Sequence, residues 1–156
     1  MGLSRRAWFG AAGVLGLQGA LYGAWRLGRA DPLRLEGLDG RPVEWPAGPV
    51  VLHLWATWCP PCREELPLVR AQEPALPELR VVAVQSERAS VAAFPGVEGT
   101  LFAPDPDFPV AFGVGELPVT LVLDGARRVR RRAEGSQAWN AQDVASLRRT
   151  LAGLGG

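Results

Sequence analysis

Apolar residues form nearly continuous runs in three parts of the chain, and these runs predict the centre of a sheet. Residues 49–56 (PVVLHLWA), 79–85 (LRVVAVQ) and 118–124 (PVTLVLD) have strand length and little alternation between apolar and polar positions. Such continuity is typical of strands that are buried on both faces. The third run ends in an Asp-Gly pair, which predicts a turn into a further strand at 127–134.

Helical spacing appears in two longer segments, the first of which is 62–72. This segment follows Pro60 and Pro61, and proline suits a helix start because the first-turn amides lack intrahelical partners. We expect Glu64 and Glu65 in the first turn of this helix, where the helix dipole favours acidic side chains.

The second amphipathic segment is 140–153, at the end of the chain. Asn140 with Asp143 three residues later resembles a capping box, and Gly153 fits the stop of the helix. Shorter segments predict helical turns at 87–94 and 107–114, and a short strand or loop at 100–105.

Residues 33–45 carry two alternating apolar runs around Asp39 and Gly40, and an Asp-Gly pair between such runs is a hairpin signal. The predicted order is therefore a β-hairpin, then strand, helix, strand, short helix, strand, strand and helix. This order predicts an α/β fold in which a mixed central sheet is flanked by helices on both faces.

The N-terminal segment has a different character. Residues 7–25 carry no charge and lie between Arg5 and Arg6 on one side and Arg26 and Arg29 on the other. Their length is close to the ~20 residues that cross a bilayer and greater than the ~7–15 residues of a secretory core. We expect a single-pass anchor in the cytoplasmic membrane that leaves the remaining chain on the periplasmic, extracytoplasmic side. A cleaved export signal and a buried soluble helix are the alternatives.

These features divide the chain into a signal-anchor with its linker at 1–30 and one domain at 31–156. A net charge of +1 provides no general attraction to nucleic acid, so we expect no nucleic-acid partner. Five arginines between 127 and 132 predict a solvated edge strand whose charge prevents edge-to-edge pairing. Contact with anionic lipid or with a docking partner is the alternative for this strand.

Both cysteines of the chain lie where the first buried strand meets a helix, in Cys59-Pro60-Pro61-Cys62. The nucleophilic form of cysteine is the thiolate, and a helix N-terminus stabilises its negative charge. We expect an exposed Cys59 with a lowered pKa and a shielded Cys62 one turn further on. Cys59 would attack a partner's disulfide, and Cys62 would resolve the mixed disulfide that results.

Other chemistries of the cysteine pair are less favoured. A structural zinc site needs about four ligands, and a structural disulfide closing so short a loop stabilises little. A Cu(I) site built from Cys59, Cys62 and His53, the only histidine, remains an alternative because thiolates suit Cu(I). We expect redox exchange, with no cofactor other than the redox-active Cys59–Cys62 disulfide and no metal.

Residues 54–67 (LWATWCPPCREELP) closely resemble the active-site segment of thioredoxin-like proteins, in particular the membrane-anchored TlpA/ResA-type branch. Residues 33–46 resemble the N-terminal hairpin extension of that branch, and residues 112–125 resemble its second active-site loop. The resemblance covers about residues 33–152 and implies a thioredoxin fold. It also implies a thiol–disulfide oxidoreductase of cytochrome c maturation.

The resemblance assigns further residues to the site. Pro118 becomes a cis-proline that faces the disulfide, and Leu117 presents its backbone to an extended substrate. Trp58 matches the tryptophan beside the nucleophile, and Pro60 and Pro61 join it in the surface that meets the substrate. A trans proline that starts a strand is the alternative for Pro118.

Glu65 matches an acidic residue of this branch that tunes the pKa values of the cysteines, with an ordinary first-turn glutamate as the alternative. His53 departs from the family pattern, since thioredoxins carry an aspartate at this position and this branch often carries asparagine. His53 is therefore either an acceptor for the proton of Cys62 or a neutral imidazole in the core.

We expect a monomer that reduces protein disulfides, either in apocytochrome c or in a protein of copper-site assembly. A reductant in an oxidising compartment has to be reduced again, which implies a membrane electron-donor protein as a second partner. A disulfide oxidase or isomerase of the same fold and a Cu(I)-binding protein are the alternatives.

Overall fold

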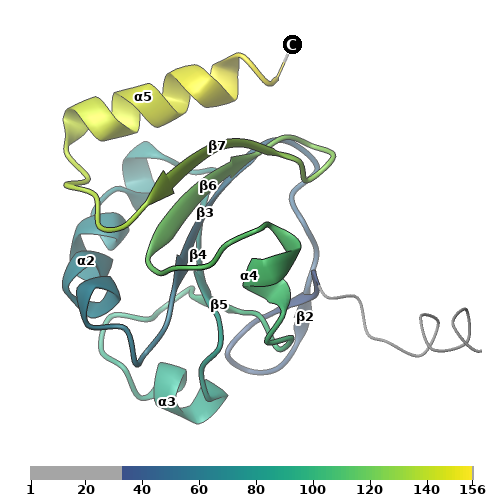
Figure 1. The fold of residues 1–156 in the computed structure, drawn as a ribbon, viewed down its shortest axis with the longest axis vertical. Coiled ribbons are helices and arrows are strands. Elements are labelled where there is room, and N and C mark those ends of the chain that lie inside the picture. The colour runs from purple at the N-terminus through teal and green to yellow at the C-terminus, as the bar shows by residue number, and fades with distance from the viewer. Residues whose placement is uncertain (1–32, 156) are drawn as a thin grey trace, which may run out of the picture. The chain divides into compact units, whose positions relative to one another are not determined.

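The structure is a computed structural model that describes residues 33–155 (Figure 1). The predicted anchor at 7–25 and the predicted boundary between residues 30 and 31 lie outside the described residues. Within residues 33–155, no helix has the length and apolar character that crossing a membrane requires.

A mixed sheet of seven strands forms the centre of the described region, in the order β2-β1-β5-β4-β3-β6-β7. Strand β3 pairs in parallel with β4 and antiparallel with β6, and β4 pairs in parallel with β5. The strands are β1 (Leu35–Glu36), β2 (Pro42–Val43), β3 (Val50–Trp55), β4 (Leu79–Ala83), β5 (Leu101–Phe102), β6 (Val119–Leu123) and β7 (Val129–Glu134). The predicted mixed α/β sheet is confirmed.

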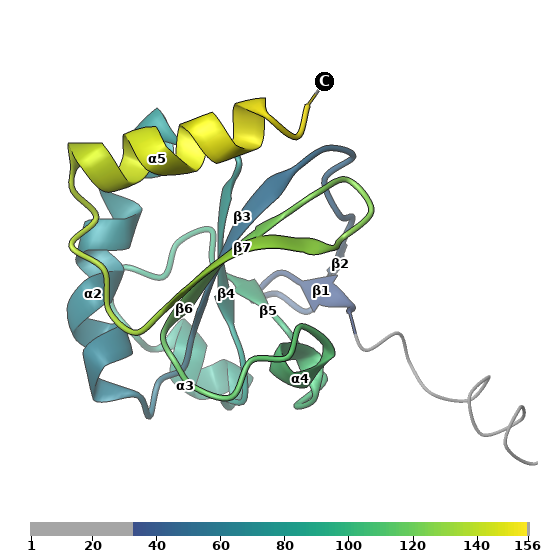
Figure 2. The ribbon, with the colours of Figure 1, turned by 45° about the horizontal axis from the view of Figure 1, so that its top comes forward.

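Helices cover both faces of this sheet, as predicted (Figure 2). Along β3, Val51 and Trp55 belong to the apolar layer under the long helices, whereas Leu52 and Leu54 belong to the opposite layer. The helices are α2 (Pro60–Arg70), a 3-10 turn η1 (Glu73–Ala75), α3 (Arg88–Ala92), α4 (Phe108–Ala111) and α5 (Ala141–Ala152). The first layer joins the sheet to α2 and α5, and the second joins it to α4.

Helix α2 begins at the two prolines, as predicted. Cys59 is its N-cap and Pro60 its first residue, so the two prolines form part of the first turn. The prediction that Glu64 and Glu65 lie in the first turn is therefore wrong, because no acidic residue occupies that turn. At α5 the predicted capping box is confirmed: the Asn140 side chain accepts bonds from the helix amides, and Asp143 accepts one from the Asn140 N–H.

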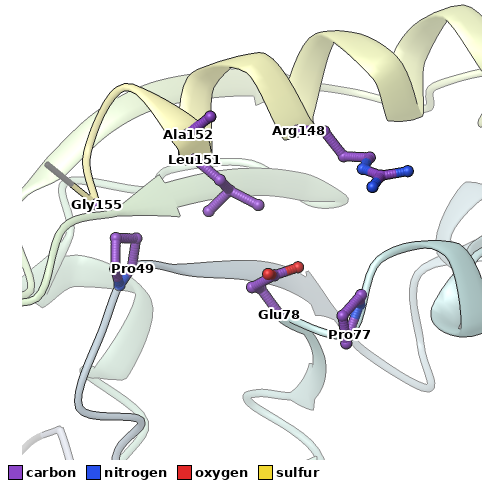
Figure 3. Close-up of a pocket in the computed structure, with 7 residues that line it drawn as sticks. All are labelled: Pro49, Pro77, Glu78, Arg148, Leu151, Ala152 and Gly155. Carbon is purple, nitrogen blue, oxygen red and sulfur yellow. The ribbon is translucent and has the colours of Figure 1, made fainter.

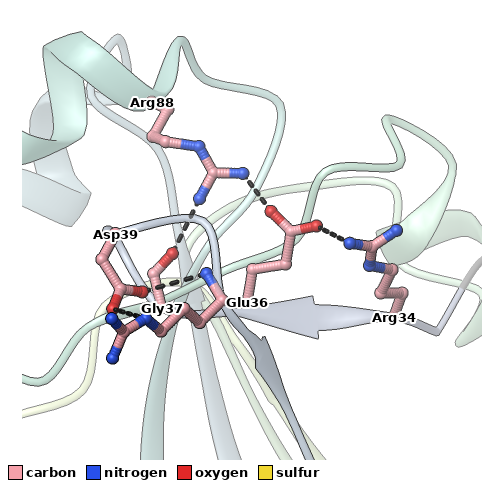
Figure 4. A network of polar contacts seen from close by, with 6 residues as sticks. Arg34, Glu36, Gly37, Asp39 and Arg88 are labelled. Atoms are coloured by element: carbon pink, nitrogen blue, oxygen red, sulfur yellow. Dashed lines mark hydrogen bonds and ion pairs between the residues drawn. The ribbon is translucent and has the colours of Figure 1, made fainter.

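A buried carboxylate connects the first strands to the rest of the fold (Figure 4). Strands β1 and β2 pair antiparallel, and Glu36 of β1 forms ion pairs with Arg34 and Arg88. The Arg88 guanidinium also donates to the Gly37 carbonyl at 2.7 Å and lies 4.3 Å from the centre of the Phe102 ring. Arg88 thereby links β1 to the start of α3 and to β5.

Strand β7 lies at an edge of the sheet, as predicted from its charge. Three of its arginines have partners within the chain. Arg130 pairs with Asp124 at 2.7 Å, Arg131 donates to the Ser146 hydroxyl at 2.8 Å, and Arg132 donates to the Gly113 carbonyl at 2.7 Å. The charged edge strand is therefore tied to neighbouring elements through these contacts, in addition to facing solvent.

We predict that stability depends strongly on the buried leucines of β3. Leu54→Ala removes a fully buried side chain and should lower the free energy of unfolding by about 2–5 kcal/mol through lost burial and a residual cavity. Leu68→Ala, on the exposed side of α2, is the matched control and should change it by less than about 0.5 kcal/mol. Urea unfolding measures both, and equal losses would contradict the prediction.

Candidate active site

The two cysteines are bonded to each other at the start of α2. Their Cα atoms are 5.3 Å apart, and the Cys62 N–H donates to Cys59 Sγ at 3.3 Å. Only 3% of Cys59 and none of Cys62 is exposed, so the expectation of an exposed Cys59 is wrong for this disulfide form. The physical reason is that the bond turns Cys59 Sγ back over the first turn of α2. As predicted, Cys62 is more shielded from solvent than Cys59.

Trp58 forms the exposed surface beside the buried disulfide. Its side chain is 59% exposed, although its indole N–H donates to the Gln85 carbonyl at 2.7 Å. Gln85 follows β4 in a left-handed conformation with a φ of 48°. Pro60 and Pro61 are exposed as well, so the predicted substrate-facing residues at this end of the strand are accessible.

The predicted cis-proline is confirmed at the Leu117–Pro118 bond. The pairing of Leu54 with Val119 places Pro118 at the start of β6, beside the end of β3. Leu117 packs against the apolar layer that contains both cysteines, and it lines a cavity of about 320 Å³ together with Trp58. The fold thus brings the second active-site loop to the cysteine motif, more than fifty residues away in sequence.

Glu65 is a buried carboxyl, only 3% exposed, one helical turn after Cys62. Its Oε1 accepts hydrogen bonds from the Gln137 N–H at 2.9 Å and from the Trp139 indole N–H. Its Oε2 is also buried but accepts no hydrogen bond from the described residues. Burial raises the pKa of Glu65, and the hydrogen bonds from the Gln137 N–H, the Trp139 indole and the Ser136 side chain partly oppose that shift. Glu65 thus lies beyond the first turn of α2, and its carboxyl is buried and hydrogen-bonded.

His53 is fully buried on β3 and lies on the same face as the cysteine layer. Its Nδ1 is 3.2 Å from the Thr120 hydroxyl, and its ring meets the Trp139 ring edge-on with centroids 5.5 Å apart. Burial, with a smaller effect from the positive charge of Arg70, lowers the pKa of His53 to about 3. With a pKa of about 3, the His53 imidazole has little affinity for a proton at neutral pH, so the structure favours the packed alternative for His53.

Trp139, Gln137 and Gln85 belong to this site but were not found from the sequence. Trp139 lies 74 positions after Glu65 in the chain, and Gln137 lies 72 positions after it. No motif spacing connects them to the cysteines. The one sequence signal is a lone tryptophan in a polar segment immediately before the cap of the last helix.

The structure does not assemble the copper site considered from the sequence. Within residues 33–155 no group of three histidine, cysteine or acidic side chains is placed to hold a metal ion. His53 instead contacts Thr120 and Trp139.

A separate cavity of about 330 Å³ lies beyond the N-terminal end of β3, between the strand ends and α5 (Figure 3). Its lining includes Pro49, Glu78 and Arg148. None of the predicted site residues lines it, so it is not part of the cysteine site.

The arrangement of the described region defines a thioredoxin-like fold with a disulfide at the start of its first long helix. DsbF from MTB, solved in mixed oxidised and reduced forms, is similar with a TM-score of 0.59 and 25% identity. The match covers 79% of this chain and 95% of DsbF. No protein-family model matches the chain.

The sequence comparisons name the proteins that this chain resembles. The thiol-disulfide oxidoreductase ResA of Geobacillus thermodenitrificans is 31% identical over 110 residues, which cover 65% of this chain and 63% of ResA. The thiol:disulfide interchange protein DsbE homolog of Paracoccus denitrificans is 36% identical over 93 residues, which cover 56% of this chain and 51% of that protein. The matches thus span about half to two thirds of the relatives' length. The predicted resemblance to ResA-type thiol–disulfide oxidoreductases is confirmed.

We predict that His53 makes the fold less stable in mild acid. Its folded pKa of about 3 lies below the ordinary value of 6.5, so the unfolded chain binds a proton that the folded chain does not. Stability therefore falls as the pH drops from about 6.5 toward 3. Between about pH 6.5 and 5, wild type should lose about 1–2 kcal/mol more than His53→Gln.

Urea unfolding of both proteins at the two pH values measures this difference. The raised pKa of Glu65 acts in the opposite direction in both proteins, so it cancels in the comparison. Equal pH dependence of wild type and His53→Gln would contradict a buried neutral His53.

Proposed function

We propose that this protein is a thiol–disulfide oxidoreductase that transfers two electrons from the Cys59–Cys62 dithiol to disulfides of other proteins. The observation that carries the proposal is the Cys59–Cys62 disulfide across the first turn of α2, beside exposed Trp58 and the Leu117–Pro118 bond. The similarity to the thiol-disulfide oxidoreductase ResA and to a DsbE-type thiol:disulfide interchange protein supports the same reaction.

Cys59 is the attacking residue in this proposal because it caps the 11-residue helix α2. The unpaired amides of a helix N-terminus stabilise negative charge, and the Cys62 N–H already points at Cys59 Sγ. In the reduced protein the Cys59 thiolate attacks one sulfur of the substrate disulfide. A mixed disulfide forms, and the other substrate sulfur leaves as a thiolate.

Cys62 completes the transfer. Its thiol gives up a proton, and the resulting thiolate attacks Cys59 Sγ. The Cys59–Cys62 disulfide forms, the second substrate sulfur leaves as a thiolate, and both released thiolates then take up protons. The substrate disulfide has gained the two electrons that the dithiol has lost.

Glu65 is the acceptor for the proton of Cys62 in this scheme. The two residues are three positions apart on α2, which places them on the same helix face, and both are buried. A buried thiol has no direct access to water, so an internal base is needed. A carboxyl with a raised pKa suits this role better than His53, whose pKa is about 3.

The substrate face is formed by Trp58, the exposed Pro60 and Pro61, and Leu117. The cavity between Trp58 and Leu117 suits an extended segment of a protein substrate whose backbone pairs with Leu117. We also propose that residues 7–25 anchor the protein in the cytoplasmic membrane, with the domain on the extracytoplasmic side. Strands β1 and β2 are, in this proposal, the hairpin extension of the ResA-type branch.

The substrates that we propose are the disulfides of apocytochrome c or of a copper-site assembly protein. Such a reductant acts as a monomer and is itself reduced by a membrane electron-donor protein. This assignment rests on the resemblance of the site segments to the cytochrome c maturation branch.

We predict different losses for the two cysteine variants. Cys62→Ala keeps the nucleophile but cannot resolve the mixed disulfide, so a covalent complex with a protein disulfide such as insulin should accumulate. Cys59→Ala should form no such complex. Both variants should lose at least roughly a hundred-fold in insulin reduction, because each lacks one bond-forming sulfur. Non-reducing electrophoresis detects the complex, and complex formation by Cys59→Ala but not by Cys62→Ala would reverse the two roles.

We predict a reducing potential for the Cys59–Cys62 pair. Equilibration of the full chain with dithiothreitol buffers should give a value near that of thioredoxin, about −270 mV. A value near about −120 mV, typical of a strong oxidant, would overturn the proposed direction and indicate a disulfide-forming enzyme.

A further inference from the structure

The two oxygens of the Glu65 carboxyl have different environments. Oε1 is held by the Gln137 N–H and by the Trp139 indole N–H, whereas the buried Oε2 accepts no hydrogen bond from residues 33–155. Hydrogen bonds to one oxygen fix the plane of the carboxyl and stabilise its charged form. The second oxygen is left as the position where a proton can bind.

Trp139 is itself held firmly in the loop between β7 and α5. It is 3% exposed, and it adopts a left-handed backbone with a φ of 51°, which is unusual for a bulky residue. The capping residue Asn140 of α5 follows it directly, and the edge-on contact with His53 orients its ring. The backbone, the cap and the ring contact together aim the indole N–H at Glu65.

We propose that Trp139 is a positioning residue of the redox site, which binds Glu65 Oε1 through its indole N–H and so leaves Oε2 to receive the proton of Cys62. This inference rests on the proposed thiol–disulfide exchange and names the residue that controls its base. Without the indole donor, the carboxylate would lose one of the hydrogen bonds, from Gln137, Trp139 and Ser136, that stabilise its charged form. Glu65 would then hold its proton at higher pH and would accept the Cys62 proton less readily at neutral pH.

Charged side chains near Glu65 and Trp139 do not account for the raised pKa of Glu65. Burial and hydrogen bonds, not charged side chains, are the influences that shift its pKa. His53 faces Trp139 from β3 and is neutral, and on α2 the Arg70 guanidinium is bound by Glu73. Arg131 of β7 and Asp143 of α5 line the small cavity behind Trp139.

Trp55 provides a matched control for this role. It is as deeply buried as Trp139 and lies in the same apolar layer, but its indole N–H has no hydrogen-bond partner among the described residues. Trp139→Phe and Trp55→Phe therefore make the same chemical change in one layer. Only the first removes a hydrogen bond to Glu65.

The first measurement uses the full chain in its oxidised form, so that no thiol titrates. The Glu65 carboxyl is followed by ¹³C NMR against pH, with its signal identified by its loss in Glu65→Gln. Trp139→Phe should raise the pKa of Glu65 by about one unit, the worth of a hydrogen bond to a charged group. Trp55→Phe should leave the pKa of Glu65 unchanged. Equal pKa values of Glu65 in the two variants would overturn the proposal.

A measurement on the unmodified protein keeps the proposal testable if Trp139→Phe does not fold. The ¹⁵N–¹H signal of the Trp139 indole should shift with pH at the same midpoint as the Glu65 carboxyl. The Trp55 indole signal should stay constant. If the chemical shift of the Trp139 indole stays constant while Glu65 titrates, the proposal is overturned.

The last measurement separates this inference from the proposed function. The rate at which Cys62 resolves a mixed disulfide is measured against pH, and its midpoint should rise by about one unit in Trp139→Phe. In a Glu65→Gln background, Trp139→Phe should cause no further shift. An NMR shift without a change in the rate profile would overturn the role of Glu65 as base and with it the functional part of the inference. If Trp139→Phe raises the pKa of Glu65 as expected but the wild-type protein exchanges no disulfides, the proposed function is overturned while the contact between Trp139 and Glu65 stands.

Discussion

Strand β3 lies between β4 and β6 and is buried on both faces along its whole length. Because side chains cover both faces, the end of the strand is held in place, and the chain turns from there into α2 with Cys59 as the cap. The same strand pairs with the start of β6, where the Leu117–Pro118 bond lies. The reactive sulfurs and the second active-site loop thus depend on the burial of one strand for their relative position.

The apolar layer between β3 and α2 contains several buried polar atoms that have no hydrogen-bond partner among the described residues. His53 Nε2, Glu65 Oε2 and Trp55 Nε1 are all buried there without a hydrogen-bond partner. Unsatisfied buried groups cost stability, and their concentration in one layer points to a function that needs them. For Glu65 the proposed function is proton transfer. His53 contributes a neutral ring that supports Trp139, at the expense of stability in acid.

Most of the fold and the centre of the site could be predicted from the sequence. The three buried strands, the capping box of α5 and the cis bond before Pro118 follow from local patterns or from the motif, and the structure confirms them. Glu64 and Glu65 were placed too early in α2, because the two prolines and Cys62 fill its first turn. The low exposure of Cys59 was missed because it depends on the bond to Cys62.

The sequence by itself determined where the cysteine pair lies, at a strand-to-helix junction that a short segment specifies, and this pair is the basis of the proposed redox chemistry. Only the tertiary structure decided which groups surround Glu65 and His53 beside that pair. Glu65 meets Trp139 across 74 positions of the chain, and His53 is neutral because several elements exclude water from it. Long-range contact and desolvation are properties of the packed fold, and no spacing along the chain encodes them.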